Sequence, residues 1–126
     1  MRPIRKLIIH CSDTEEGTVQ SIRRYHIEHN GWSDIGYHYV IYKDGSIHSG
    51  RPECVVGAHC YGFNKDSIGI CLIGKHDFSK EQFETLRFMV SELKTKYKSI
   101  TEVKGHGEYP NQGGKTCPNF KVSEVL

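Results

Sequence analysis

The chain has 126 residues, of which 37% are hydrophobic and 25% are charged, an ordinary mixture for a globular protein. A chain of this length buries roughly two-thirds of the surface that it exposes when unfolded, so we expect one domain over residues 1–126. The formal net charge of +2 is too small to argue for a nucleic-acid partner, and we expect none.

The first half of the chain is predicted to contain a buried strand, a helix and a hairpin. Residues 6–10, KLIIH, form a short apolar run that ends in a histidine, which indicates a buried strand. Within 18–32, Val19, Ile22 and Ile27 recur near helical spacing, and Gly31 marks a plausible helix end. Residues 37–51, YHYVIYKDGSIHSGR, predict two strands around an Asp-Gly turn, because these residues tolerate the positive φ of tight hairpins.

The second half is predicted to alternate between strands and helices. Residues 67–74, SIGICLIG, indicate a second buried strand. Ser79 and Gln82 form a capping-box pattern, and the helix they begin has one apolar face, made of Phe83, Leu86, Val90, Leu93 and Tyr97. A short strand over 101–106, a loop rich in Gly, Pro and Asn over 107–119 and a last turn or short helix over 120–126 follow. Strands interleaved with helices predict an α/β fold whose central sheet is partly parallel.

The cysteines and the N-terminal segment bear on the cellular compartment. The five cysteines are odd in number and lack Cys-x-x-Cys spacing, so a reduced interior is the simpler interpretation. The apolar stretch Leu7 to Ile9 is too short for a signal peptide or a membrane span. We therefore expect cytoplasmic synthesis without a signal peptide and no membrane partner.

Two histidines end predicted strands, and a cysteine follows in the last loop. Ligands collect outside the carboxyl ends of parallel strands, where His10 and His106 would lie, and the loop brings Cys117 eleven residues after His106. Two imidazoles and one thiolate leave the fourth position of a zinc ion open for water, as a catalytic site requires. The spacing alone leaves the ordinary alternatives open: a hydrogen-bonding histidine at a strand end and a cysteine packed as a small hydrophobe.

Four segments carry a family resemblance. KLIIHCSDT, GWSDIGYHYVIYKDGSIHSGR, VGAHCYGFNKDSIGICLIG and GHGEYPNQGGKTCPN occur in this order and span almost the whole chain. Together they resemble the N-acetylmuramoyl-L-alanine amidase family, which includes phage amidase lysozymes and animal peptidoglycan recognition proteins. The resemblance implies a central mixed sheet flanked by about three helices. It also implies one Zn²⁺ ion on His10, His106 and Cys117, and hydrolysis of the amide bond between N-acetylmuramic acid and L-alanine in peptidoglycan or muropeptides.

The resemblance to the phage-type members implies two further catalytic residues. Tyr37 would position the attacking water or shuttle its proton, and Lys115 would stabilise the tetrahedral oxyanion. The alternatives are an aromatic residue packed on a sheet face and a solvated loop charge. Another branch of the family has a glutamate base where this chain has Cys71, which favours the phage-like branch and leaves Cys71 to core packing.

Other motif residues have expected roles around the substrate. The resemblance assigns substrate contacts to His59 and Asn64, although Asn64 alternatively caps a turn. Glu108 either orients a metal ligand or is an exposed loop acid. Trp32 and Arg51 either flank the groove or are structural. No role is assigned to the remaining histidines, His26, His29, His38, His48 and His76; His38 and Tyr37 alternate, so at most one of them faces the site.

Two other functions compete with the amidase. Some recognition proteins of this fold lack the cysteine ligand and only bind peptidoglycan, and the presence of Cys117 argues against that alternative. Some phage amidases also inhibit a viral RNA polymerase, and no feature of this sequence supports or excludes such a protein partner. An endolysin, an enzyme of cytosolic muropeptides and an effector delivered by a secretion machine all fit the absence of a signal peptide.

Overall fold

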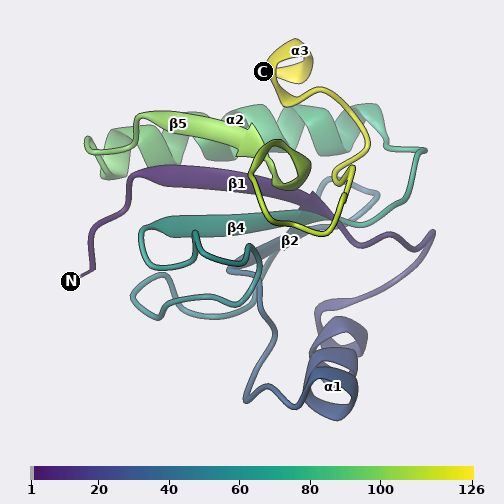
Figure 1. The fold of residues 1–126 in the computed structure, drawn as a ribbon. Helices are drawn as coiled ribbons and strands as arrows, with labels where there is room; N and C mark the ends of the chain where they lie inside the picture. Colours follow the sequence, from purple (N-terminus) through teal and green to yellow (C-terminus); the bar gives the residue numbers. More distant parts are fainter. Residues whose placement is uncertain (1) are drawn as a thin grey trace.

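A five-stranded mixed sheet forms the centre of the structure, a computed structural model that describes residues 2–126 (Figure 1). The strands are β1 (Lys6–Cys11), β2 (Tyr39–Ile41), β3 (Ile47–Ser49), β4 (Ser67–Leu72) and β5 (Glu102–Gly105). Their order is β3-β2-β4-β1-β5, in which β3 is antiparallel to β2 and the other neighbours are parallel. The predicted α/β fold with a mixed, partly parallel sheet is confirmed.

Three α-helices accompany the sheet, as expected: α1 (Val19–Asn30), α2 (Lys80–Lys96) and α3 (Val122–Val125), with a 3₁₀ turn η1 (His106–Glu108). Both long helices begin with a capping box, at Thr18 and at Ser79. Gly31 ends α1 in the left-handed conformation with φ 70°, as its sequence position predicts. The predicted apolar face of α1 is wrong at Ile27, which is 42% exposed, because the covered side of α1 consists of Val19, Ile22, Arg23 and His26.

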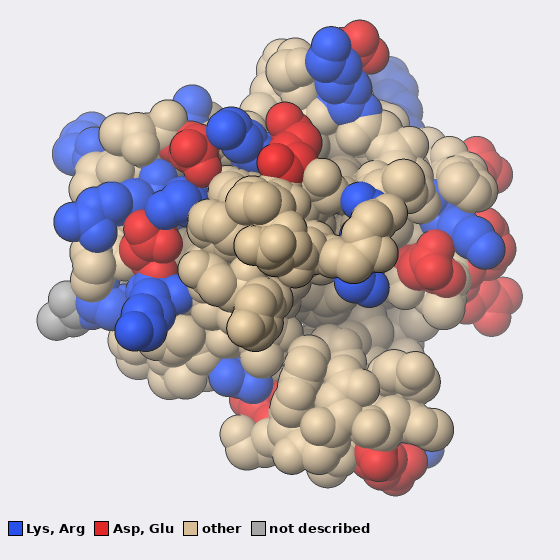
Figure 2. Space-filling view, viewed as in Figure 1, with Lys and Arg blue, Asp and Glu red and all other residues tan. Residues whose placement is uncertain are grey.

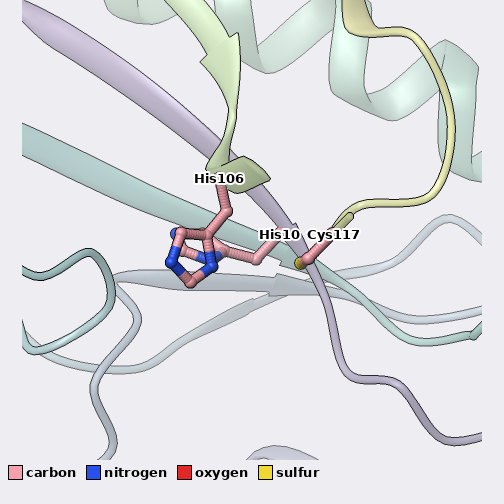
Figure 3. Close-up of side chains that lie close together, drawn as sticks. All are labelled: His10, His106 and Cys117. Atoms are coloured by element: carbon pink, nitrogen blue, oxygen red, sulfur yellow. The ribbon is translucent and has the colours of Figure 1, made fainter. Parts of the chain in front are cut away.

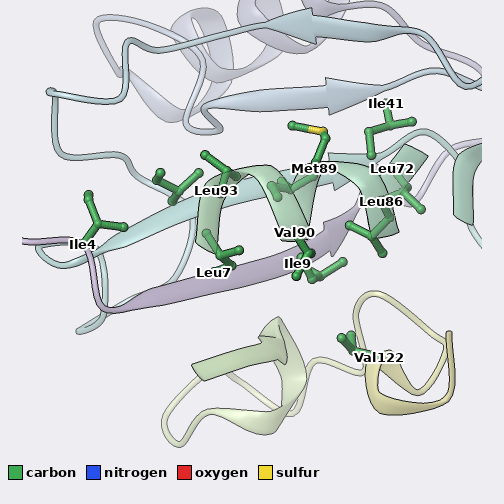
Figure 4. Packing of buried hydrophobic residues seen from close by; sticks show 12 residues of the cluster. Ile4, Leu7, Ile9, Ile41, Leu72, Leu86, Met89, Val90, Leu93 and Val122 are labelled. Atoms are coloured by element: carbon green, nitrogen blue, oxygen red, sulfur yellow. The ribbon is translucent and has the colours of Figure 1, made fainter. Parts of the chain in front are cut away.

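The main core lies between α2 and one face of the sheet (Figure 4). Leu86, Val90 and Leu93 of α2 pack in the same buried cluster as Leu7 and Ile9 of β1. Side chains alternate along a strand, so Ile8 and His10 lie on the opposite face of β1. The apolar packing against α2 therefore directs His10 to the face that is turned away from this helix.

The helix α1 lies apart from the sheet, below it in Figure 1 and on the opposite side from α2. Within residues 2–126, no helix is both long enough and apolar enough to cross a membrane.

Candidate metal and active site

His10, His106 and Cys117 converge at the carboxyl ends of two neighbouring strands (Figure 3). His10 is the next-to-last residue of β1, and His106 directly follows β5, which is parallel to β1. One potential ligand atom from each of the three residues lies within 4.8 Å of the others. The three predicted ligands thus form a group that can hold a metal ion.

The loop that carries Cys117 is fixed by close backbone packing. The Gly107 amide donates a hydrogen bond to the Cys117 carbonyl oxygen at 2.8 Å. A Cβ atom on residue 107 would lie 2.4 Å from the carbonyl oxygen of Lys115, so only glycine permits this approach. The predicted loop is confirmed, and its tight path sets the position of the thiol.

The side-chain amide of Gln112 determines which nitrogen of His106 is free. Gln112 Nε2 donates to the carbonyl oxygens of Tyr61 and Pro110, and Gln112 Oε1 accepts from the Tyr61 amide, which fixes the orientation of this amide group. His106 Nε2 lies 2.8 Å from Gln112 Oε1 and must therefore donate its hydrogen to it. The Nδ1 lone pair of neutral His106 remains available for a metal ion.

The surroundings of His10 and Cys117 also suit a cation. His10 Nε2 lies 2.9 Å from Nδ1 of His59, which leaves His10 Nδ1 free. Burial holds the pKa of His10 well below its ordinary value and also lowers that of His106, so both rings are neutral, as metal binding requires. Cys117 Sγ accepts a hydrogen bond from the Cys11 amide at 3.0 Å. The neighbouring Cys11 thiol and burial raise the pKa of Cys117, and a divalent cation held here would favour the thiolate instead.

A cavity of about 810 Å³ opens beside this group; His106 and Cys117 line it, whereas His10 is buried behind its wall. It is bounded by α1, by the segment that follows β1 and by residues 114–119, and it includes the hollow between the α1 lobe and the rest of the molecule in Figure 2. Tyr37 and Lys115 both line this cavity, and the Tyr37 ring centroid lies 5.0 Å from that of His10. Burial raises the pKa of Tyr37 well above its ordinary value, so its hydroxyl keeps its proton.

His59 and Asn64, the expected substrate contacts, do not line the cavity. His59 is 7% exposed and lies behind His10, where it bonds to that ligand. Asn64 Oδ1 accepts the amides of His59 and Cys60, each at 2.9 Å, which is the turn-capping alternative considered for this residue. Cys71 is fully buried in an apolar cluster and is the register partner of His10, in agreement with core packing.

Glu108, Trp32 and Arg51 take structural positions. Glu108 Oε2 accepts the Gly105 amide at 2.6 Å and so caps η1, while Gln112 orients the ligand His106 in its place. Trp32 packs edge-on against the ring of His26, and Arg51 donates to backbone carbonyl oxygens. Of these three residues, none lines the cavity.

Residues near the site that the sequence did not predict include Tyr25, His26 and Gln112. Tyr25 and His26, on α1, line the cavity. Gln112 holds a ligand, and the only available signal was its place six residues after His106 in the same motif. His38, to which no role was assigned, is fully buried outside the cavity; its Nδ1 accepts the Gly69 amide at 3.0 Å, and its Nε2 lies 2.8 Å from the Val55 carbonyl oxygen.

Fold and site together define a small α/β protein with a candidate metal site at the carboxyl edge of its sheet. The sequence pattern of the N-acetylmuramoyl-L-alanine amidase family matches residues 1–120. The chain belongs to this family of peptidoglycan amidases.

Individual relatives agree with this membership. The endolysin of Klebsiella phage KP32 is 36% identical, over 93% of this chain and 82% of the phage protein. The amidase LysC of Clostridium intestinale URNW superposes with a TM-score of 0.89 at 33% identity, over 98% of this chain and 83% of LysC. Bumblebee PGRP-SA superposes with a TM-score of 0.82 at 30% identity, over 98% of this chain and 80% of its own.

Proposed function

We propose that residues 1–126 act as one catalytic domain that hydrolyses the amide bond between N-acetylmuramic acid and L-alanine with a zinc ion held by His10, His106 and Cys117. The observation that carries the proposal is the convergence of these three side chains next to one cavity, which is lined by His106, Cys117, Tyr37 and Lys115. Two imidazoles and one thiolate are a donor set of catalytic zinc, with one position left for water.

Bound zinc supplies a water of lowered pKa and polarises the scissile carbonyl. Tyr37 is protonated and lies beside His10, so its hydroxyl orients the attacking water by hydrogen bonding, and it takes a proton from this water as it passes its own proton to the leaving amine. The Lys115 ammonium stabilises the negative charge that develops on the carbonyl oxygen. Both side chains extend from segments that form the cavity wall, which positions them toward a substrate placed there.

Digestion of purified sacculi tests this proposal. The zinc-loaded protein is expected to release new L-alanine amino termini, and mass spectrometry of defined muropeptides is expected to show cleavage at the muramyl amide bond. A chelator should abolish the release, and added zinc should restore it. Binding to sacculi without new L-alanine termini and without stoichiometric zinc would identify a recognition module instead.

The relatives that are named endolysins lead us to propose that the chain acts on the cell wall after release or delivery. Comparison of activity on intact sacculi and on soluble muropeptides distinguishes this from a role in the cytosol. A preference of more than about tenfold, or 1.4 kcal/mol, for the soluble fragments would contradict the wall-directed role.

A further inference from the structure

The imidazole of His59 lies between a metal ligand and a buried serine. Its Nδ1 is 2.9 Å from Nε2 of His10, and its Nε2 is 3.2 Å from Oγ of Ser67. His59 and Ser67 are both buried, so water does not compete for these contacts. His59 thus connects the strand residue Ser67 to the ligand His10.

The hydrogen bonds assign every proton in this connection. Ser67 Oγ donates its single hydrogen to the Phe63 carbonyl oxygen at 2.7 Å and can only accept from His59. His59 and His10 are both buried and neither of these contacts involves a carboxylate, so each ring is neutral and carries one N–H group. Since His59 Nε2 donates to Ser67, His59 Nδ1 must accept from His10 Nε2. The His10 proton is thereby fixed on Nε2, and the lone pair is on Nδ1.

The strand beneath His59 is shaped to receive the ring. Ser67, Gly69 and Cys71 share one face of β4, and Cys71 is the register partner of His10. A Cβ atom on residue 69 would lie 2.7 Å from Cγ of His59 and 2.8 Å from its Nδ1. Glycine at position 69 therefore leaves the space that the ring needs to reach from Ser67 to His10.

We propose that His59 is a positioning residue for the metal site, which acts with Ser67 to hold His10 in the tautomer whose Nδ1 faces the metal ion, rather than a residue that contacts substrate. The assignment of the ion rests on the proposed function, but the tautomer of His10 does not, because the hydrogen bonds that fix it are made by protein groups alone. The motif VGAHCYGFNKDSIGICLIG contains residues 59, 67 and 69. In this proposal all three serve to hold the tautomer of His10.

The first test measures the tautomer in metal-free protein by ¹⁵N NMR of the histidine rings. We expect wild-type His10 to carry its proton on Nε2. In Ser67→Ala the acceptor is lost, so His59 is free to protonate Nδ1, and we expect a mixture of His10 tautomers. Ser99→Ala is the matched control, because this hydroxyl donates to the Ile4 carbonyl oxygen at the opposite edge of the sheet and its loss should leave His10 unchanged. An unchanged His10 tautomer in Ser67→Ala would overturn the proposal.

The second test measures zinc affinity by competition with a chromophoric chelator. Loss of a hydrogen-bond partner of a metal ligand weakens metal binding by about 10- to 100-fold. We expect a decrease in zinc affinity of this size in Ser67→Ala, Gly69→Ala and His59→Phe. His59→Asn, whose Oδ1 can accept from His10, should recover part of the affinity. Thermal unfolding of each metal-free variant shows whether it is folded.

Kinetics at saturating zinc distinguish the two possible roles of His59, which are positioning of His10 and contact with the substrate. A positioning residue that does not line the cavity leaves KM within about twofold in Ser67→Ala. A raised KM in His59→Phe with wild-type zinc affinity would refute the proposal and establish substrate contact. If wild-type protein binds no zinc while the tautomer responds to Ser67→Ala as expected, the proposed zinc function fails and the positioning of His10 stands.

Discussion

Replacing Tyr37 by phenylalanine removes one oxygen from the wall of the cavity. The ring keeps its packing beside His10 and His26, with centroid distances of 5.0 and 5.6 Å. The lost hydroxyl costs about 1 kcal/mol of folding free energy at most, the usual net value of one hydrogen bond. Zinc affinity should stay within about twofold of wild type, because Tyr37 supplies no ligand atom.

Turnover, in contrast, should fall by about 10²- to 10⁴-fold, the usual contribution of a positioned acid or base, which corresponds to about 2.7–5.5 kcal/mol. The assay is release of L-alanine termini from a defined muropeptide at saturating zinc, with metal content and thermal unfolding measured on the same preparation. Tyr61→Phe is the matched control, since this exposed tyrosine lies outside the cavity lining. A Tyr37→Phe protein with turnover within threefold of wild type would refute the catalytic assignment.

Three further predictions concern the metal, the oxyanion and pH. Cys117→Ser should weaken zinc binding by more than about 100-fold in chelator competition, because loss of a group that only hydrogen-bonds to a metal ligand already costs about 10- to 100-fold. Equal affinity would exclude the cysteine as a ligand, and Cys54→Ser, at an exposed cysteine, is the control. Lys115→Met should lower kcat by about 10²-fold or more with zinc content and thermal stability unchanged, because the side chain is exposed; a change in KM alone would instead indicate substrate binding. Burial lowers the pKa of His38 to about 4. The His38 imidazole therefore takes up a proton below about pH 6.5 in the unfolded chain, but only below about pH 4 in the folded chain. The unfolding free energy of the metal-free protein should therefore fall on acidification through this window, and His38→Asn should reduce the slope by up to about 1.4 kcal/mol per pH unit in urea titrations; an unreduced slope would contradict the assignment.

The strands and the proximity of His10 and His106 were predictable because they follow from local pattern. Short apolar runs predicted β1 and β4, and the capping box and apolar face predicted α2. Parallel strands end at a common edge, so a histidine at the end of β1 and another just after β5 had to lie near each other once the strands were neighbours. The position of Cys117 required the motif, since the path of a Gly-rich loop does not follow from its sequence pattern.

The supporting residues were not predictable in the same way. Gln112 and Glu108 both follow His106 within the same loop, and only the folded chain shows that the amide reaches the imidazole while the carboxylate caps η1. Contacts of His59 depend on the space above Gly69, which a strand pattern does not reveal. The exposure of Ile27 has a similar origin, since helical spacing predicts a common face but not how much of it is covered.

The placement of the ligands at residue 10 and at residues 106 and 117 has a consequence for biosynthesis. The ribosome synthesises the chain from its N-terminus, so His10 leaves the ribosome well before His106 and Cys117 are translated. No nascent or prematurely terminated chain that lacks residue 117 contains the complete ligand set. The candidate metal site can therefore form only after residue 117 has left the ribosome.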